Sequence, residues 1–490
     1  MNTTEEMLTE FLLREPLGSS GRTLQRELYL RLRQAIVSGR LAAGFQLPGT
    51  RTLARVLGIS RNTAEAACQQ LATEGYLLRD RRGARVVFLP QPAPGAEIQK
   101  SVKTYQAKLS LRAQAVASGS RRRQAPLLFS PGVPALNRFP LRRWSNCVEN
   151  VLKTTGPALL AYGDPCGELA LRNAIARHLS LARAIPCQAG QIIVTEGAQQ
   201  ALELSVQLLT NPGECAWLEN PGYRGARTAF RQGELQIIPV AVDEEGMCCS
   251  PELWQSSPPA LIYTSPSHQY PLGGVLSVAR RFALLQRARE TGAWIIEDDY
   301  DSEFRHTGDP VPAMQGLMTE PPVIYCGTFS KTMFPSLRIG YLVLPPQLVE
   351  AAMPVLNTLL RGGNRMTQLA LAEFIERGYY ARHLSAMRRL YRDRQLALRQ
   401  ALRDAIPCRH QIVGGGGGMH LSLVFASRLD DQALALQARR YHMAPAALSD
   451  FLHDESHLLS GLVLGYGNTS RSQFTASARR LGQLIAAAQR

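Results

Sequence analysis

Two apolar segments that end abruptly in polar residues constrain the fold of this chain more than any other feature of its sequence. Val323–Cys326 is typical of a buried strand and continues into Gly327–Lys331, which holds two hydroxyl groups and an amine. Trp294–Ile296 is a second such strand and continues into Glu297–Tyr300, which holds three carboxylates. Both segments therefore place reactive polar groups at the exit of a buried strand.

The residue types at these two exits fit pyridoxal phosphate. The Lys331 amine can form a Schiff base with an aldehyde, and hydroxyl and backbone N–H groups beside it can hold a phosphate. The cofactor also needs a carboxylate on its pyridine nitrogen. Asp298 and Tyr300 are two residues apart, so on a strand they point to the same side and suit the ring nitrogen and the ring hydroxyl. The alternatives are a solvated lysine and acids that cap an element or form salt bridges.

A third segment has the features of an anion-binding turn. Gln191–Thr195 predicts a strand, and Glu196–Leu202 predicts the start of a helix that Gly197 opens. Backbone N–H groups at a helix N-terminus suit a phosphate ester. Because many strand-to-helix turns carry a glycine, this segment indicates a phosphate site only together with the other two.

Together these segments resemble the fold type I aminotransferases, and more closely the aminotransferase-like half of the MocR/GabR group of regulators. The resemblance covers roughly residues 126–490 and implies an α/β fold, with a large, mostly parallel sheet domain and a smaller α+β domain. The matching segments follow the family order: Tyr162–Pro165, Glu196–Leu202, Glu219–Tyr223, Ser267–Pro271, Glu297–Phe304 and Gly327–Arg338.

The resemblance also implies a role for each candidate site residue. Lys331 carries the Schiff base, Asp298 (or, as the alternative, Asp299) meets the pyridine nitrogen, Tyr300 meets the ring hydroxyl, and Tyr223 lies against the ring. The phosphate is held by six residues: Gly197, Ala198, Gln199, Thr328, Ser330 and Arg338. Tyr162 reaches the phosphate of the neighbouring subunit in a head-to-tail homodimer.

Three departures from the family pattern bear on the ligand. Tyr270 stands where the aminotransferases place an asparagine before a proline, so the ring hydroxyl must be served by another residue: His268, Gln269 or Tyr300. The late strand that carries a carboxylate-binding arginine in the family corresponds to Gly461–Tyr466, which has no arginine. Gly225 stands where the GABA-responsive member has a second arginine. The two missing arginines argue against an α-amino acid or GABA as the ligand.

The N-terminal segment predicts a small unit of three helices and a hairpin. Leu24, Leu28, Leu32 and Ile36 recur every four residues, which predicts an amphipathic helix over 24–39 that ends at a glycine. A second helix is predicted over 47–58, and Ser60 is a natural N-cap for a third. Residues 77–87 then predict a hairpin with an arginine-rich tip, that is, a wing.

This segment resembles the GntR-type winged helix-turn-helix. The family pattern is met at thirteen positions: Pro48, Arg51, Leu53, Ala54, Leu57, Gly58, Ser60, Arg61, Thr63, Glu74, Gly75, Tyr76 and Leu77. Ala64 and Cys68 replace a common valine and a common tyrosine, which we interpret as changes in core packing. The wing tip Arg81–Gly83 replaces the usual Gly-x-Gly.

The resemblance implies that double-stranded DNA is a partner. In such a module the start of the recognition helix enters the major groove, where Arg61, Asn62 and Thr63 would read bases and backbone. Three further arginines would hold phosphates: Arg51, Arg81 and Arg82. The alternative is that these arginines form a solvated basic face.

The charge of the chain is unevenly distributed along the sequence. Of the net charge of +16, residues 1–90 carry +5 and residues 91–125 carry +6, which leaves +5 for the other 365 residues. We therefore expect a DNA-binding domain over 1–90, a basic flexible linker over 91–125 that could hold a short helix between residues 98 and 117, and an effector domain over 126–490. The run Gly414–Gly418 predicts a flexible turn, since no Lys-Ser/Thr follows it as in a phosphate loop.

Cysteine usage and hydropathy indicate a cytoplasmic protein. The nine cysteines contain no Cys-x-x-Cys pair and suggest neither a zinc site nor a disulfide framework, and no metal is expected. No signal peptide pattern and no apolar run of membrane-spanning length is found. Two functions fit: a transcription regulator that senses pyridoxal phosphate or its adduct with an amine, and a working aminotransferase that carries a DNA-binding arm. The missing arginine anchors favour the regulator.

Overall fold

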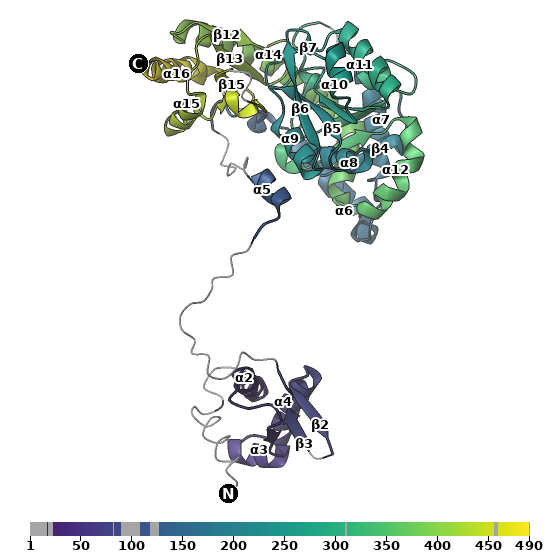
Figure 1. Ribbon diagram of the computed structural model, residues 1–490, viewed down its shortest axis with the longest axis vertical. Coiled ribbons are helices and arrows are strands. Elements are labelled where there is room, and N and C mark those ends of the chain that lie inside the picture. The colour runs from purple at the N-terminus through teal and green to yellow at the C-terminus, as the bar shows by residue number, and fades with distance from the viewer. Residues whose placement is uncertain are drawn as a thin grey trace. The chain divides into compact units, whose positions relative to one another are not determined.

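The chain forms two compact units. The structure, a computed structural model, describes residues 17, 23–81, 83–89, 108–117, 127–308, 311–454 and 459–489. Figure 1 shows the ribbon of both units, and the boundary between them falls between Lys108 and Leu109. Among the helices of the described ranges, none combines the length and the apolar character that are needed to cross a membrane.

The first unit has the helices and the hairpin that the sequence predicts. Its described elements are α2 (Leu24–Val37), β1 (Gln46–Leu47), α3 (Thr50–Leu57), α4 (Arg61–Thr73), β2 (Leu77–Asp80) and β3 (Gly83–Val86). The strands form a sheet of order β1-β3-β2, and the β2–β3 hairpin is the predicted wing. Leu28, Leu32 and Ile36 of α2 are buried in the core with Ala64 and Cys68 of α4, as predicted, whereas Leu24, the first residue of the predicted apolar series, is 39% exposed.

The second helix of this unit is shorter than predicted. Leu47 belongs to β1, and α3 begins only at Thr50 with Gly49 as its N-cap. Leu47 precedes Pro48, whose ring disfavours the helical region for the residue before it, so the chain stays extended there. The helix then ends at Gly58, which adopts a left-handed φ of 65°.

A mixed sheet of eight strands forms the centre of the second unit. Its order is β4-β11-β10-β9-β8-β5-β6-β7, and the pairs β10/β9, β9/β8, β8/β5 and β5/β6 are parallel. The strands are β4 (Ile192–Thr195), β5 (Cys215–Asn220), β6 (Gln236–Asp243), β7 (Gly246–Met247), β8 (Leu261–Thr264), β9 (Trp294–Asp299), β10 (Val323–Thr328) and β11 (Gly340–Val343). The strands predicted from the sequence at 191–195, 294–296 and 323–326 are β4, β9 and β10.

Both faces of this sheet are buried. Alternate residues of a strand enter different clusters: Tyr325 packs in one apolar core, while Ile324 and Cys326 pack in another. Ile295 and Ile296 of β9 are likewise divided between two cores. Because side chains alternate across a strand, a strand covered on both faces reads as a continuous apolar run, which explains the uninterrupted runs in the sequence.

The described residues of the second unit also form a smaller sheet and twelve α-helices. The antiparallel sheet has the order β12-β13-β15-β14, formed by β12 (His410–Val413), β13 (His420–Phe425), β14 (Ala446–Ala447) and β15 (Gly461–Gly465). The described helices are α5 (Leu111–Ala117), α6 (Leu141–Thr155), α7 (Leu169–Arg183), α8 (Ala198–Leu209), α9 (Arg224–Gln232), α10 (Pro251–Ser256), α11 (Val278–Thr291), α12 (Pro346–Leu359), α13 (Arg365–Glu376), α14 (Tyr379–Ala405), α15 (Asp431–Ala438) and α16 (Phe474–Ala488).

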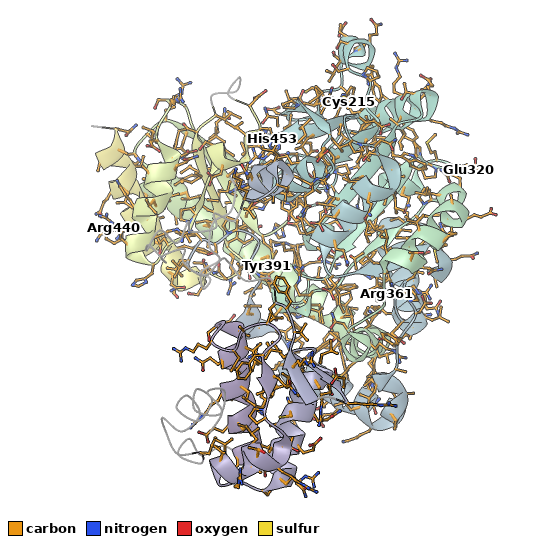
Figure 2. All side chains as sticks on the ribbon, turned by 60° about the horizontal axis from the view of Figure 1, so that its bottom comes forward. Cys215, Glu320, Arg361, Tyr391, Arg440 and His453 are labelled. Carbon is orange, nitrogen blue, oxygen red and sulfur yellow. The ribbon has the colours of Figure 1, made fainter. Side chains whose placement is uncertain are left out.

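Two contacts show how distant segments are joined within this unit. Tyr391 of α14, labelled in Figure 2, accepts a hydrogen bond from the Ala135 backbone N–H at 3.0 Å and packs edge-on against Phe304. The short helix α5 lies in the segment predicted as a linker, and Arg112 pairs with Glu234 beyond α9 at 2.7 Å. The short helix expected between residues 98 and 117 is therefore present, and it belongs to the second unit.

A buried ion pair fixes the end of β9. Arg183, the last residue of α7, lies 2.7 Å from Asp299 through its Nε, and both side chains are almost fully buried. The same guanidinium donates to Ser267 Oγ at 2.6 Å and to the Val311 backbone carbonyl. One arginine thus joins a helix end, a strand end and two loops.

We predict that Arg183→Met lowers the free energy of unfolding of the second unit by about 3 to 5 kcal/mol, because Asp299 would keep a buried charge without its cation. All four tryptophans lie in this unit, so fluorescence during urea unfolding reports on it alone. Arg177→Met is the matched control: Arg177 pairs with Glu376 on the surface, and its loss should cost less than about 1 kcal/mol. Equal effects of the two substitutions would contradict a structural role for the buried pair.

Candidate functional site

The predicted cofactor residues converge on one edge of the large sheet. Strands β5, β8, β9 and β10 run parallel, so the segments that follow them leave the sheet at the same edge. β4 points the same way, because it pairs antiparallel to β11, which pairs antiparallel to β10. The carboxyl ends of parallel strands are the usual ligand site of such sheets. Residues far apart in sequence are thereby brought into one site.

Asp298 is buried near the end of β9 and is only partly satisfied. Its Oδ2 accepts a hydrogen bond from the Tyr263 hydroxyl at 2.6 Å. Its Oδ1 has no hydrogen-bond partner among the residues that the structure describes. Burial, opposed by the Tyr263 hydrogen bond, raises the pKa of the Asp298 carboxyl to about 7. A buried oxygen of this kind is costly unless a ligand supplies a donor.

Asp299 has a different environment. Besides Arg183, it accepts hydrogen bonds from the Tyr325 hydroxyl at 2.6 Å and from the Ser302 hydroxyl at 2.8 Å. Successive side chains of a strand point to opposite faces, which separates it from Asp298. Its oxygens are thus engaged within the protein, whereas Asp298 keeps an acceptor for a ligand.

The Lys331 amine lies just beyond the end of β10. It donates a hydrogen bond to the Gly132 carbonyl oxygen at 2.9 Å. Gly132 has a φ of +71°, and a Cβ there would come within 2.6 Å of the lysine nitrogen, so only glycine leaves room for it. Asp298 and Lys331 are close enough for the lysine charge to lower the carboxyl's pKa, against the larger effect of burial.

A helix N-terminus and an arginine form the anion-binding part of the site. Gly197 is the N-cap of α8 with a φ of +87°, and the first N–H groups of a helix have no partners within it. Arg338 donates to the Glu196 carbonyl at 2.7 Å, and its Nη1 lies 3.3 Å from where a Cβ on Gly197 would be. Ala198 and Gln199 form the first turn of α8, while Thr328 and Ser330 adjoin each other through a 3.2 Å hydrogen bond.

Aromatic side chains line the space between Asp298, Lys331 and the start of α8. The Tyr223 ring stacks on Tyr263 at 6.5 Å between centroids and meets the edge of Tyr270 at 6.2 Å. Gly225 is next to it, and a Cβ at that position would collide with the Tyr223 ring. Tyr223 is therefore placed where a planar ring above Asp298 could lie against it.

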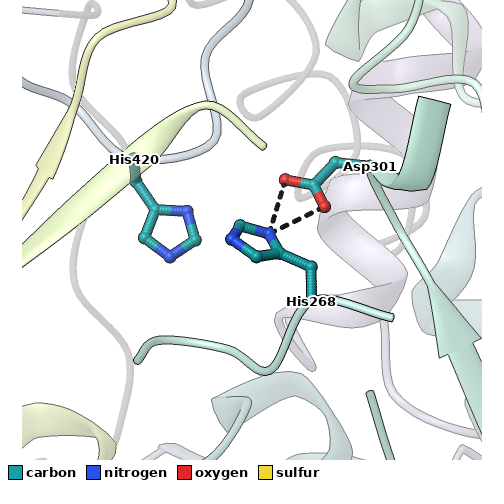
Figure 3. Close-up of side chains that lie close together, drawn as sticks. All are labelled: His268, Asp301 and His420. Atoms are coloured by element: carbon teal, nitrogen blue, oxygen red, sulfur yellow. Dashed lines mark hydrogen bonds and ion pairs between the residues drawn. The ribbon is translucent and has the colours of Figure 1, made fainter. Parts of the chain in front are cut away.

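Tyr300, His268 and Asp301 form a hydrogen-bonded chain beside this space. Tyr300 lies one residue past the end of β9, and its hydroxyl is 2.9 Å from His268 Nδ1 and donates to the His268 carbonyl at 2.8 Å. His268 Nδ1 is also 2.9 Å from Asp301, and His420 of β13 lies beside His268 (Figure 3). Gln269, in contrast, directs its amide to Glu219 and to the carbonyls of neighbouring residues.

One predicted site residue lies apart from the others within the single chain. Tyr162 follows the turn after α6, and its side chain is 94% exposed. Its role was predicted for a neighbouring subunit, which a single chain does not contain.

Three groups of the site were not singled out from the sequence. Tyr263 holds Asp298, Gly132 holds Lys331, and the pair Asp301–His420 surrounds His268. Tyr263 faces Asp298 only because β8 pairs in register with β9, where Tyr263 lies opposite Ile296. Gly132 is 199 residues from Lys331 in sequence. No local sequence pattern predicts such contacts. Asp301, however, follows Tyr300 and lies within the segment Glu297–Phe304 that matched the family pattern.

The predicted DNA-reading residues lie at the start of α4. Ser60 caps the helix by accepting a hydrogen bond from the Thr63 N–H at 3.1 Å, which confirms the predicted N-cap. Arg61 and Asn62 are exposed, while the Thr63 hydroxyl is 2.8 Å from Ser60 Oγ and so belongs to the cap. Arg51 of α3 and Arg81 of the hairpin turn are also exposed; Arg82 lies outside the described residues.

Comparison with known families accounts for both units. Residues 24–87 match the bacterial regulatory proteins of the gntR family, and residues 137–455 match aminotransferase class I and II. The chain is 38% identical over 449 residues to the probable rhizopine catabolism regulatory protein MocR of Rhizobium meliloti, covering 90% of each chain. It is 31% identical over 447 residues to the pyridoxine biosynthesis transcriptional regulator PdxR of Corynebacterium glutamicum, covering 91% of this chain and 92% of the relative.

Solved aminotransferases share the fold of the second unit. The multiple substrate aminotransferase of Thermococcus profundus has a TM-score of 0.69 at 26% identity, covering 79% of this chain and 98% of that chain. The α-aminoadipate aminotransferase LysN of Thermus thermophilus, complexed with N-(5'-phosphopyridoxyl)-L-leucine, has a TM-score of 0.68 at 26% identity, covering 78% of this chain and 96% of that chain.

The residues at the sheet edge fit the cofactor that this fold implies. The unpaired Asp298 oxygen suits a protonated ring nitrogen, the Lys331 amine suits an aldehyde, and the start of α8 with Arg338 suits a phosphate. The cofactor of the second unit is therefore pyridoxal 5'-phosphate. With a GntR-type DNA-binding unit ahead of an aminotransferase class I and II domain, this chain belongs to the MocR group of transcription regulators.

Proposed function

We propose that this regulator binds pyridoxal phosphate through Lys331 and responds to the cofactor, or to an amine that reacts with it, by changing how its winged units engage DNA. The observation that carries the proposal is the buried Asp298 oxygen that lacks a partner among the described residues, in a site that also presents Lys331. Regulation of DNA binding by a ligand requires that the ligand stabilise one arrangement of the protein over another.

Each residue has a definite task in this proposal. Pyridoxal phosphate supplies an aldehyde that reacts with amines and a ring that withdraws electrons from the carbon attached to them. Asp298 holds the proton on the ring nitrogen, and its partner Tyr263 keeps the carboxylate in place. Tyr223 lies against the ring, and Tyr300 faces the ring hydroxyl. The phosphate is held by Gly197, Ala198, Gln199, Thr328, Ser330 and Arg338.

A working aminotransferase is the second candidate. The chain is 28% identical over 364 residues to the 2-aminoadipate transaminase of Thermus thermophilus, covering 73% of this chain and 90% of that enzyme. The described segment β15 carries no arginine, however, and transamination needs a substrate held in a fixed orientation as well as a cofactor. We therefore assign the site mainly to sensing.

The remaining assignments concern assembly and DNA. We assign the DNA-binding domain to residues 1–90, a basic linker to 91–125 and the effector domain to 126–490, in a cytoplasmic protein. Arg61, Asn62 and Thr63 read the major groove, while Arg51, Arg81 and Arg82 hold phosphates. Two chains form a head-to-tail homodimer in which the exposed Tyr162 of one chain serves the phosphate site of its partner.

A spectrum of the purified protein with added cofactor tests the central proposal. We expect a visible absorption band that Lys331→Ala removes, because that variant lacks the amine to which the cofactor attaches. Asp298→Ala should keep the lysine but weaken cofactor binding by about tenfold to a hundredfold, because the ring nitrogen loses its carboxylate. The absence of a band in the unmodified protein would contradict the site assignment.

The same samples separate the two candidate functions. A panel of amines and amino acids is added, and the band and any keto product are followed. A change in the band without product indicates a sensor, whereas accumulation of product indicates a transaminase. Identical DNA binding by the cofactor-free, cofactor-bound and amine-treated forms would rule out the proposed regulation.

Two substitutions in the first unit should differ in kind. Arg61→Ala should weaken binding to the preferred operator by about 1 to 3 kcal/mol and relax the sequence preference at one base pair, because a base contact is lost. Arg51→Ala should weaken binding to all sequences alike and reduce the salt dependence by about one ion, because a phosphate contact is lost. Selection from a random DNA pool, combined with a salt titration, distinguishes these outcomes. The assignment of the two arginines would be contradicted if Arg51→Ala relaxed the sequence preference and Arg61→Ala weakened binding to all sequences alike.

Mixed dimers test whether the site is shared between chains. Lys331→Ala and Tyr162→Ala chains each form dimers with two defective sites, whereas a dimer of one chain of each kind contains one intact site. We therefore expect mixing after dissociation to restore high-affinity cofactor binding to about a quarter of all sites. No restoration, with the Tyr162→Ala protein binding the cofactor normally, would show that Tyr162 acts elsewhere.

A further inference from the structure

A buried carboxylate, an imidazole and a phenol form a continuous chain at the side of the cofactor site. Asp301 Oδ1 and Oδ2 lie 2.9 and 3.2 Å from His268 Nδ1, and the Tyr300 oxygen lies 2.9 Å from the same nitrogen. The close-up in Figure 3 shows His268 between Asp301 and His420. The cofactor tasks of the site leave Asp301 and His268 without an assigned role.

The glycine run between β12 and β13 closes over this chain. Gly418 has a φ of +75°, and a Cβ there would come within 2.2 Å of the His268 ring and within 2.5 Å of Asp301. The Tyr466 hydroxyl holds the Gly418 carbonyl at 2.7 Å. Asp301 and His268 are consequently 2% and 4% exposed. The run predicted as a flexible turn is thus a close cover for a polar pair.

The hydrogen bonds fix the direction in which Tyr300 can act. A phenol has one proton, and the Tyr300 proton is donated to the His268 backbone carbonyl at 2.8 Å. An ionised Asp301 can only accept, so His268 Nδ1 carries a proton that lies between the carboxylate and the phenol oxygen. The Tyr300 oxygen then has lone pairs, and no proton, to offer to a neighbouring ligand.

We propose that Asp301 and His268 are positioning residues that hold the Tyr300 hydroxyl as a hydrogen-bond acceptor toward the cofactor, so that the ring hydroxyl of bound pyridoxal phosphate keeps its proton. This inference rests on the proposed cofactor site. In this proposal the pair takes the place of the asparagine amide that the aminotransferases have before the cis proline, a position where this chain has Tyr270. The pair thereby sets the charge of the ring that reacts with amines.

Other titratable groups face the same space and are common to every variant compared. Burial raises the pKa of the Tyr300 hydroxyl, and the charges of three neighbours raise it further: Tyr270 in the loop after β8, Asp298 of β9 and Glu219 of β5. His420 approaches from β13 with its ring centroid 5.0 Å from that of His268, and Lys331 approaches from the end of β10. Burial raises the pKa of Asp301, and the His268 ring opposes that effect. A comparison of variants isolates the pair from this constant background.

The test is a pH titration of the absorption spectrum of the full-length protein loaded with pyridoxal phosphate, because the ring absorbs differently with and without its hydroxyl proton. We expect Asp301→Asn to lower the midpoint by about one pH unit, that is, about tenfold in the ionisation constant. Without the carboxylate, the proton is no longer fixed on His268 Nδ1, so the Tyr300 oxygen is no longer held as an acceptor for the ring hydroxyl. His268→Gln should shift the midpoint in the same direction and covers the case of an Asp301 variant that does not fold.

A double-mutant cycle with Tyr300→Phe distinguishes a chain of contacts from a general effect of charge. If the pair acts through the phenol, Asp301→Asn has no further effect once the phenol oxygen is removed. His306→Gln is the matched control, because His306 is a buried histidine of the same region that hydrogen-bonds Tyr466 at 3.0 Å. It should leave the midpoint unchanged.

Two results would overturn the assignment of the pair while leaving the cofactor site intact. One is a midpoint that Asp301→Asn leaves unchanged or raises in a protein that still shows the cofactor band. The other is an equal shift with and without the Tyr300 hydroxyl. Absence of any cofactor band in the unmodified protein would instead overturn the cofactor site and this assignment together.

Discussion

The need to satisfy buried carboxylates organises the edge of the large sheet. Five acids are buried there: Glu219, Glu297, Asp298, Asp299 and Asp301. Four of them have partners within the protein. Glu219 accepts hydrogen bonds from two hydroxyls and an amide, and Glu297 accepts them from two backbone N–H groups. Asp299 pairs with Arg183, and Asp301 contacts His268. Only Asp298 keeps an oxygen without a partner among the described residues. Because a buried ion without a partner is costly, the arrangement singles out one carboxylate for a ligand.

The elements and the reactive residues of the site could be predicted from the sequence because their signals are local. A continuous apolar run followed by polar residues indicates a buried strand and its exit. This was sufficient to predict β9 and β10, with Asp298 near the end of the first and Lys331 just beyond the end of the second. The Ser60 cap and the buried positions of α4 follow from equally short patterns. The predicted start of α3 at residue 47 was wrong, because Pro48 disfavours a helical backbone at Leu47 and the helix begins only at Thr50.

The supporting residues could not be predicted, because their contacts depend on the register of distant strands. Tyr263 reaches Asp298 only through the pairing of β8 with β9. The choice between Asp298 and Asp299 likewise depended on Arg183, which lies more than one hundred residues earlier in the chain. The sequence of the run Gly414–Gly418 does not predict that Gly418 packs against Asp301 and His268. Tertiary context, rather than residue type, decides which of two adjacent acids keeps an acceptor oxygen for a ligand.

The raised pKa of Asp298 has a consequence for how the site is filled. Burial raises the pKa of this carboxyl to about 7, so it takes up a proton at a much higher pH than an exposed aspartate does. The Oδ1 atom of Asp298, which has no partner among the described residues, would face the pyridine nitrogen of a bound cofactor and would hold the proton between the two groups. The burial that disfavours an isolated carboxylate would therefore favour a protonated ring nitrogen as its partner, because a pair of opposite charges replaces a single buried charge.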